Sequence, residues 1–430
     1  MILLSSFTGF AQNFDKAKLD SYFDLLEENN KFIGSVAISE NGEIVYTKTI
    51  GHVDIENNIK ADAESKYRIG SISKTFTTVL SLQAVEKGKL NLSQTIEGYF
   101  PNIPKADKIT IQHLLSHRSG IHNFTNDEDY LSWNTQAQTE EEMVAMIAQK
   151  GSDFKPGSRA EYSNSNFVLL TYILEKAYQK PYSQLVSMYI TEPINLKNTY
   201  LGGKIKPGHN ECKSYRFSGS WQLETETDIS IPLGAGGIVS TPSDLVRFSD
   251  ALFGGKLVSK ESLDLMMTIE DGYGIGLFQI PFHDKLAYGH TGGIDGFSSI
   301  FAHFSDGNIS YALVSNGSNF NNNDISIATL SAVYDKAYEL PTFKVYDLSS
   351  EDLDKYLGVY SSKQVPLKIS ITKDGNTLIA QATGQAAFPL DATEKDIFQF
   401  DPAGVVMEFA PTEKSFILKQ GGGAFTFTKE

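Results

Sequence analysis

Apolar positions first repeat at helical spacing in residues 13–30, which predicts an amphipathic helix at the start of the chain. Residues 35–39 and 43–48 then alternate between apolar and polar side chains, and an Asn-Gly pair at 41–42 joins them. Alternation on both sides of an Asn-Gly pair is the strongest short-range signal of a β-hairpin. The chain is therefore predicted to begin with a helix followed by two paired strands.

Residues 67–90 carry the next clear pattern: a strand-like stretch, a turn at Gly70, and apolar residues whose spacing fits a helix buried in a core. From about residue 71 to residue 200 the pattern stays mostly helical. Strands are predicted again in four later segments: 273–278, 286–290, 297–304 and 309–315. We expect the early and late strands to form one antiparallel sheet, with the helical middle as a second lobe. A helix from about residue 325 to residue 338 would cover that sheet.

After about residue 349 the pattern changes to short alternating strands separated by glycine-containing turns. Such a pattern predicts a small all-β unit, a barrel or a sandwich. The expected fold class is therefore α+β: an antiparallel sheet flanked by helices plus a helical lobe in residues 13–345, followed by a small all-β barrel domain in residues 346–430.

Length and charge limit the classes of partner. The chain has 430 residues, which suggests two or three domains. Its 37 Lys and Arg residues and 52 Asp and Glu residues give a formal net charge of −15, without a run of basic residues. We therefore expect neither a nucleic acid nor an anionic membrane surface as the main partner. No transmembrane segment is expected, because no stretch approaches the ~20 apolar residues that span a bilayer. The oligomeric state is left open.

Residues 1–12, MILLSSFTGFAQ, resemble the end of an export signal: a short apolar run, then small residues, then a polar break. The basic leader that begins such a signal is missing from this sequence. We expect an exported protein, with the periplasm as its compartment. The single cysteine, Cys212, allows no disulfide within the chain, so the fold must depend on its hydrophobic core.

Ser71 and Lys74 fall in the first turn of the helix predicted after Gly70. Residues at i and i+3 share one helical face, so the hydroxyl and the amine can lie within hydrogen-bond reach. Burial lowers the pKa of a lysine, which makes Lys74 a candidate proton acceptor for Ser71. The Ser-x-x-Lys pattern also occurs at 152–155 and 370–373, but neither copy lies on a predicted buried helix. Ser71 is therefore the candidate nucleophile.

Two further stretches carry polar residues in informative contexts. The segment from Tyr162 to Asn164 follows a Pro-Gly loop, and Tyr162 alone among twenty tyrosines has an asparagine two positions later. An isolated pattern of this kind more often marks a turn in which the asparagine bonds its own backbone. The segment from His290 to Gly293 lies on a predicted strand. A glycine pair there either admits another backbone or a substrate, or marks a bulge.

Taken together and in this order, three segments resemble the motifs of the serine β-lactamase and penicillin-binding protein superfamily: 71–74, 162–164 and 290–292. The resemblance is closer to the class C β-lactamase and D-alanyl-D-alanine carboxypeptidase branch. It covers about residues 15–338, and three supporting stretches also match: 109–121, 234–241 and 272–276. The trailing unit resembles the lipocalin-like barrels appended to some of these hydrolases, chiefly through residues 356–360.

The resemblance implies hydrolysis through an acyl-enzyme on Ser71. Lys74 and Tyr162 would share the removal of the Ser71 proton and the delivery of a proton to the leaving group. The backbone N–H groups of Ser71 and Gly293 would form the oxyanion hole. Asn164 would bond the amide side chain of the substrate or hold Lys74. The implied substrate-binding residues are Asn164, His290, Thr291 and Gly292.

His290 is a departure from the family pattern, because many β-lactamases carry a lysine at this position. A histidine is only partly charged near neutrality, so it is a weaker clamp for a substrate carboxylate. This lowers the expectation of efficient β-lactam hydrolysis. The favoured substrates are peptides containing D-amino acids, cleaved in the manner of a carboxypeptidase or an aminopeptidase. A small ester or a β-lactam is the alternative.

Several other classes of protein are alternatives to a hydrolase that completes both acylation and deacylation. A penicillin-binding sensor or a binding protein without turnover stays possible on the same scaffold. The chain has no Gly-x-Ser-x-Gly, so an α/β-hydrolase is unsupported. His113 and His117 have the spacing of a zinc pair, but no glutamate follows His113, and the resemblance makes both structural. We expect no cofactor and no metal, and a small molecule or peptide as the substrate.

Overall fold

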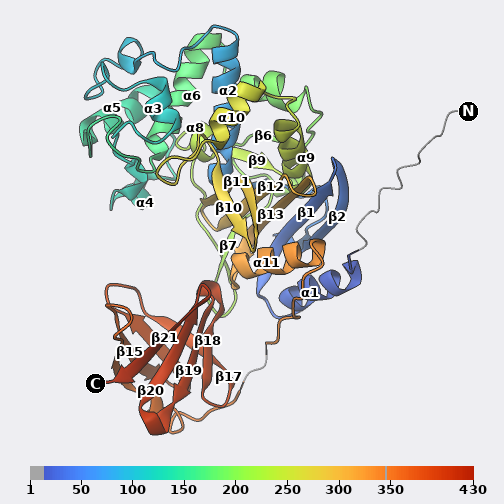
Figure 1. The fold of residues 1–430 in the computed structure, drawn as a ribbon, viewed down its shortest axis with the longest axis vertical. Coiled ribbons are helices and arrows are strands. Elements are labelled where there is room, and N and C mark those ends of the chain that lie inside the picture. Colours follow the sequence, from blue (N-terminus) through green and yellow to red (C-terminus); the bar gives the residue numbers. More distant parts are fainter. Residues whose placement is uncertain (1–13, 344–345) are drawn as a thin grey trace, which may run out of the picture. The chain divides into compact units, whose positions relative to one another are not determined.

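The computed structural model describes residues 14–343 and 346–430. The export signal predicted at residues 1–12 lies outside the described residues. The chain divides into two compact units (Figure 1): one comprises Phe32–Gly317, and the other combines Ser318–Glu430 with the segment that ends at Lys31. Within the described ranges, no helix has the length and apolar character needed to cross a membrane.

The unit of residues 32–317 contains a six-stranded sheet in which the early hairpin lies at one edge (Figure 1). Its strands, in spatial order, are β10 (Phe278–Phe282), β11 (Lys285–Ile294), β12 (Phe297–Phe304), β13 (Ile309–Ser318), β1 (Phe32–Glu40) and β2 (Glu43–Ile50). The backbone N–H of Asn41 donates to the carbonyl of Asn308 at 2.9 Å, where the end of β1 meets the start of β13. The prediction that early and late strands share one antiparallel sheet is therefore confirmed.

The helical middle of the chain is also confirmed, and one helix lies at its centre. Every residue of α2 (Ser73–Glu86) from Ser73 to Ala84 is buried. A helix that is buried on all faces belongs in a core, which explains why its sequence is apolar with small hydroxyl side chains between. The other helices of this unit are α3 (Ile111–Leu115), α4 (Tyr130–Trp133), α5 (Glu140–Lys150), α6 (Asn164–Tyr178), α7 (Tyr182–Val186), α8 (Leu233–Gly236), α9 (Pro242–Phe253) and α10 (Lys260–Met267).

Short strands connect the helical lobe to the rest of the unit. β5 pairs with β9 next to the start of α2, and β9 also pairs with β6. The short strands are β3 (His52–Asp54), β4 (Ile59–Lys60), β5 (Tyr67–Arg68), β6 (Tyr200–Leu201), β7 (Tyr215–Phe217), β8 (Trp221–Leu223) and β9 (Ile238–Ser240). The β5–β9 pair fixes the position of the backbone that leads into α2.

The strand predicted at residues 273–278 is wrong except for Phe278, where β10 begins. The segment before it folds back on itself: the backbone N–H of Gly274 donates to the carbonyl of Leu277 at 3.0 Å. Gly276 has a φ of +69°, a left-handed conformation that glycine adopts without steric cost and that departs from the extended backbone of a regular strand. The alternating glycines therefore make a tight turn, although their spacing resembles that of a strand.

The second unit contains a closed eight-stranded barrel, which confirms the predicted all-β unit. Its strands are β14 (Gly358–Ser361), β15 (Lys368–Asp374), β16 (Thr377–Ala382), β17 (Phe388–Glu394), β18 (Ile397–Phe400), β19 (Val405–Ala410), β20 (Ser415–Gln420) and β21 (Gly423–Lys429). β14 pairs with both β15 and β21, so no edge strand is left open. The predicted boundary between residues 345 and 346 stays a prediction.

Two helices belong to the same unit as the barrel. α1 (Lys16–Glu28) forms where the first amphipathic pattern predicts a helix, and Asp15 caps it by accepting from the backbone N–H of Lys18 at 2.9 Å. α11 (Asn322–Val333) forms where a helix over residues 325–338 is predicted, but it begins and ends earlier. Asn321 caps α11, which explains its earlier start.

Candidate active site

Ser71 lies on a tight turn between β5 and α2. Gly70–Ile72 form one turn of 3₁₀ helix, and α2 follows directly at Ser73. The turn places the partly exposed Ser71 beside Lys74, whose side chain is fully buried. The Lys74 Nζ lies 3.0 Å from the Ser71 Oγ, so the predicted contact between these two side chains is present.

Lys74 Nζ has two further oxygen neighbours, and both only accept hydrogen bonds. They are Asn164 Oδ1 at 2.7 Å and the carbonyl oxygen of Ala235 in α8 at 2.6 Å. Burial lowers the pKa of Lys74 well below the ordinary lysine value. A neutral amine has two N–H donors and one lone pair. In its neutral form, Lys74 would direct both donors at Asn164 and Ala235 and its lone pair at the Ser71 hydroxyl.

Tyr162 approaches Ser71 from the segment that precedes α6. Its hydroxyl donates to the Ser71 Oγ at 2.7 Å, and Lys74 Nζ lies 4.8 Å from the centre of its ring. Burial raises the pKa of Tyr162, and the hydrogen bond to Ser71 offsets part of that rise. The phenol is therefore protonated near neutral pH and donates to Ser71, which makes Lys74 the stronger base of the two residues that contact Ser71.

The ring of His117 packs against the ring of Tyr162, a contact that the sequence did not predict. The two rings stack with their centres 4.5 Å apart, and His117 Nδ1 accepts from the backbone N–H of Ser163 at 3.1 Å. His113 instead caps α3, where its Nδ1 accepts from the backbone N–H of Thr110. Among the side chains that the structure describes, no cluster of three or more His, Cys, Asp and Glu residues could hold a metal ion.

The glycine pair of β11 lies directly against the Ser71 turn. A Cβ atom on Gly292 would lie 2.0 Å from the carbonyl oxygen of Ile69, and one on Gly70 would lie 2.7 Å from the backbone nitrogen of Gly293. Only glycine allows two backbones to approach this closely. Of the two interpretations given for this pair, close backbone approach is the one observed, and it brings Ser71 and Gly293 to the same cavity.

The Gly70→Ala variant tests the importance of this contact. We expect it to lower kcat/KM by about 10- to 100-fold, because β11 must move away from Ser71 and small misplacements at a reacting centre are costly. The measurement is steady-state kinetics together with a thermal melting curve. Gly88→Ala is the matched control, since Gly88 also has a positive φ, +66°, but has open space around the added Cβ. Equal losses in both variants would show that backbone strain alone explains the effect.

His290 is buried, with 2% of its surface exposed, and its ring packs against Phe278. Its Nδ1 lies 2.5 Å from the carbonyl oxygen of Thr291, so this nitrogen carries the ring proton. Burial lowers the pKa of His290 to about 3. The imidazole is therefore neutral near pH 7, which is an even weaker anion clamp than the partly charged histidine that we expected.

A cavity of about 580 Å³ opens beside Ser71. Its lining residues are Ser71, Phe124, Thr125, Tyr130, Leu131, Asn134, Asn164, Glu224, Thr225, Thr227, Pro232, Ala235, Gly236, Gly293, Ile294 and Asp295. Of the predicted substrate-binding residues, Asn164 lines this cavity, whereas His290, Thr291 and Gly292 lie outside its lining. The charged members of the lining are Glu224 and Asp295, both acidic.

Asp295 and Arg68 form an ion pair at the edge of this cavity that sequence reasoning missed. Arg68 donates to Asp295 Oδ2 at 3.1 Å and to Glu226 Oε1 at 2.6 Å, and its side chain is only 1% exposed. Asp295 Oδ1 accepts from both the backbone N–H and the hydroxyl of Thr227. An arginine inside the apolar strand that leads to Ser71 was the available signal, because a buried arginine requires an acidic partner.

An antiparallel sheet with a helical lobe, and a Ser-x-x-Lys turn between them that a tyrosine contacts, define a serine hydrolase of the β-lactamase and penicillin-binding protein superfamily. Comparison with known families agrees. The chain belongs to the Beta-lactamase family, whose model matches residues 19–336.

Individual proteins show the same relationship at low identity. The chain is 26% identical to penicillin-binding protein 4* of Bacillus subtilis (strain 168), over 94% of this chain and 96% of that protein. Among solved structures, it resembles the octameric penicillin-binding protein homologue from Pyrococcus abyssi, with a TM-score of 0.69, 24% identity and coverage of 96% and 100%. It also resembles a D-stereospecific amidohydrolase from Streptomyces sp., with a TM-score of 0.61, 29% identity and coverage of 71% and 95%.

Proposed function

We propose that this protein hydrolyses amides or short peptides of D-amino acids by transferring the aminoacyl group to Ser71 and then to water. The hydrogen-bond chain from Tyr162 through Ser71 to Lys74 is the observation that carries the proposal. In it the serine hydroxyl accepts from a phenol and faces an amine whose lone pair is free. This is the arrangement that activates a serine as a nucleophile.

Acylation begins when Lys74 accepts the Ser71 proton and the Oγ bonds to the substrate carbonyl carbon. The developing oxyanion is stabilised by the backbone N–H groups of Ser71 and Gly293. The carbon–nitrogen bond then breaks, the leaving amine takes the Tyr162 proton, and Lys74 returns a proton to Tyr162. In deacylation, water gives a proton to Lys74 and its oxygen attacks the ester carbon. The bond to Ser71 then breaks and the proton returns to its Oγ.

The charges around the cavity favour a substrate without a free carboxylate near the cleaved bond. A carboxypeptidase substrate and a β-lactam both carry such a carboxylate, which a cationic side chain would stabilise. Both charged lining residues are acidic, with Asp295 paired to Arg68 and Glu224 to Arg216, so the lining itself offers a substrate carboxylate no cation. His290 is neutral. An amidase or aminopeptidase substrate presents an ammonium group instead, and the resemblance to the D-stereospecific amidohydrolase supports the same choice.

Apolar side chains form another part of the cavity wall. Phe124, Leu131, Pro232 and Ile294 are members of the lining, and Leu131 is 78% exposed. This surface suits an apolar side chain on the acyl part of the substrate, because contact with it removes apolar area from water. D-phenylalanine amide therefore fits the cavity better than the amide of a charged amino acid.

A substrate panel tests the proposal. We expect D-phenylalanine amide to give the highest kcat/KM, ahead of a D-alanyl-D-alanine peptide, a short-chain nitrophenyl ester and a chromogenic cephalosporin. N-acetylation of the D-amide should lower kcat/KM by at least about 10-fold, because it removes the charge that the acidic cavity favours. L-phenylalanine amide is the matched control for stereochemistry. A preference for the carboxylate-bearing substrates would contradict this choice of substrate.

A sensor and a hydrolase both form an acyl-enzyme, but only the hydrolase then hydrolyses it. Intact mass spectrometry, followed over time after addition of a penicillin, reports both steps. A transient adduct supports a β-lactamase, whereas a stable adduct supports a sensor or a slow carboxypeptidase, which turnover on the peptide and amide panel then separates. A binding protein without chemistry shows no adduct with either the penicillin or an activated ester.

A further inference from the structure

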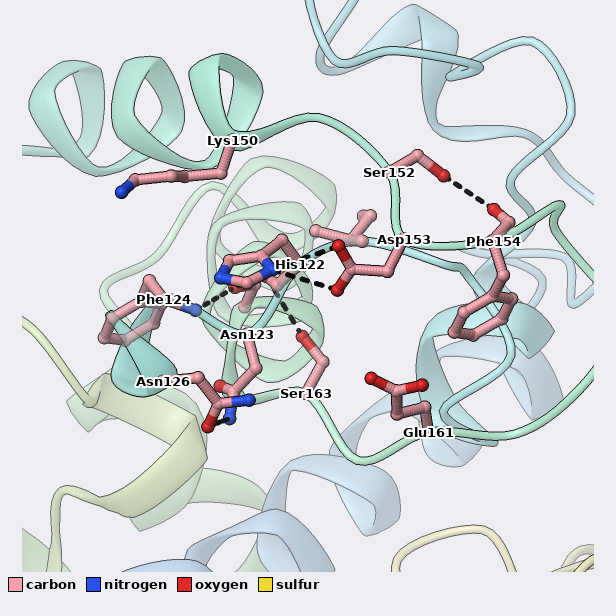
Figure 2. Close-up of polar contacts among 12 residues, drawn as sticks. His122, Asn123, Phe124, Asn126, Lys150, Ser152, Asp153, Phe154, Glu161 and Ser163 are labelled. Carbon is pink, nitrogen blue, oxygen red and sulfur yellow. Dashed lines mark hydrogen bonds and ion pairs between the residues drawn. The ribbon is translucent and has the colours of Figure 1, made fainter. Parts of the chain in front are cut away.

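Asn123 follows His122, whose ring contacts Asp153 (Figure 2). Its side chain is buried, with 8% exposed, and its Oδ1 accepts from the backbone N–H of Asn164 at 2.9 Å. The same oxygen lies 3.2 Å from Asn164 Nδ2. Its Nδ2 donates to Asn126 Oδ1 at 3.0 Å. Asn123 is absent from the cavity lining, so the mechanism above gives it no role.

These contacts determine which end of the Asn164 amide faces Lys74. A backbone N–H can only donate, so the Asn123 atom that meets it must be the carbonyl oxygen. Of the two ends of the Asn164 side-chain amide, only the nitrogen can donate to that oxygen, and it also donates to Thr125 Oγ1 at 3.0 Å. Thr125 Oγ1 in turn donates to Asn123 Oδ1 at 3.1 Å. The Asn164 carbonyl oxygen is therefore turned toward Lys74, at 2.7 Å.

The orientation of Asn164 in turn decides where the Lys74 lone pair points. While the Asn164 oxygen faces it, Lys74 donates there and to Ala235, and its lone pair faces Ser71. If the Asn164 amide rotated by half a turn, an N–H₂ group would face Lys74. The lone pair would then accept from Asn164 and would no longer face the Ser71 hydroxyl.

The backbone that carries Asn123 is also held through contacts of the preceding residue, His122, with neighbouring acidic side chains (Figure 2). His122 Nδ1 lies 2.9 Å from an oxygen of Asp153, and His122 Nε2 lies 3.2 Å from Asp127, which also pairs with Lys150. The carbonyl oxygen of His122 accepts from the hydroxyl of Ser165 at 2.6 Å. These contacts fix residue 122 at both its side chain and its backbone, so the adjacent Asn123 has little freedom to move.

We infer that Asn123 is a positioning residue that, through Asn164, keeps the Lys74 lone pair directed at Ser71. The inference rests on the proposed acyl transfer at Ser71 and assigns a role to a side chain that does not contact the substrate. It requires a carbonyl or carboxylate oxygen at position 123. A side chain of similar size without an acceptor does not meet the requirement.

The test compares Asn123→Leu, which removes the acceptor, with Asn123→Asp, which keeps it. For Asn123→Leu we expect kcat on the best panel substrate to fall about 10- to 100-fold with KM changed less than about twofold, because a catalytic group is misdirected while binding persists. Asn123→Asp should recover kcat to within about fivefold of the wild-type value, since both of its oxygens accept. Asn126→Ala is the matched control, because it removes the partner of Asn123 Nδ2 and leaves Oδ1 unchanged. Thermal melting of each variant identifies loss of folding.

A second readout needs no turnover. In protein labelled with ¹⁵N at lysine Nζ, the Lys74 resonance, assigned by its loss in Lys74→Arg, is titrated with acid in the wild type and the three variants. We expect the midpoint to move down by at least about half a pH unit in Asn123→Leu, because a donor facing Lys74 disfavours the ammonium. Wild-type-like kinetics and titration in Asn123→Leu would overturn the inference, as would equal losses in Asn123→Asp. If the Lys74 midpoint shifts in Asn123→Leu but the wild-type protein hydrolyses no panel substrate, the positioning role is supported and the proposed function is wrong.

Discussion

Replacing Ser71 with alanine is expected to lower kcat by about 10⁴-fold or more on every substrate that the protein hydrolyses, because the atom that forms the acyl-enzyme is gone. The cavity and the oxyanion-hole donors remain in this variant, but the nucleophile is absent. Steady-state kinetics measures the loss. Intact mass spectrometry after treatment with an activated ester should show an adduct on the wild-type protein and none on Ser71→Ala.

The chain provides its own control for this variant. Ser370 also stands three residues before a lysine, but it lies on barrel strand β15. Ser370→Ala should therefore retain the wild-type kcat and the adduct. If Ser71→Ala kept either the activity or the covalent label, the nucleophile would have to be another residue, and the proposed mechanism would be wrong.

Replacing Lys74 with methionine should lower kcat by about 10²- to 10⁴-fold, the range that a general base contributes. Methionine has a similar length and no lone pair that can accept the Ser71 proton at neutral pH. Lys74→Arg is the informative partner variant, because a guanidinium carries a positive charge but never accepts a proton in proteins. Equal losses in the two variants would identify Lys74 as the base, whereas an active Lys74→Arg enzyme would assign it an electrostatic role.

The pH dependence of kcat/KM provides a second test of Lys74 as the general base. Lys74 acts in its neutral form, so the rate should rise with pH as this amine loses its proton. Because burial lowers the pKa of Lys74, that rise should be complete well below pH 10. Tyr162 acts in its protonated form, and burial raises its pKa, so the fall at alkaline pH should come above about 10. The acid limb should vanish in Lys74→Met.

Much of the fold follows from local patterns in the sequence. The Asn-Gly pair at 41–42 marks the first hairpin, and the period-two alternation after residue 349 marks the barrel strands. Residues 273–277 show the limit of such patterns. Glycine alternation there has the period of a strand, but Gly276 adopts a positive φ that only the surrounding structure could specify.

The side chains that face Ser71 were predictable only in part. Lys74 is three residues away, so helical geometry alone brings it near, whereas Tyr162 and Asn164 were found through the family resemblance. His117 and Asn123 contact residues 46 and 41 positions away, and no local pattern marks them. The charge of His290 could not be anticipated either, since its burial depends on neighbours brought together by the fold.

The order of strands in the main sheet has a consequence for folding kinetics. β1 lies next to β13 in that sheet, although about 270 residues separate them in the chain. At a synthesis rate of about 5–20 residues per second, roughly 15–50 seconds pass between the emergence of the two strands. During that interval β1, which is buried along almost its whole length in the finished fold, has β2 on one edge and an unpaired edge on the other. An unpaired apolar edge is a site for aggregation, so pairing with β13 is the step that protects β1.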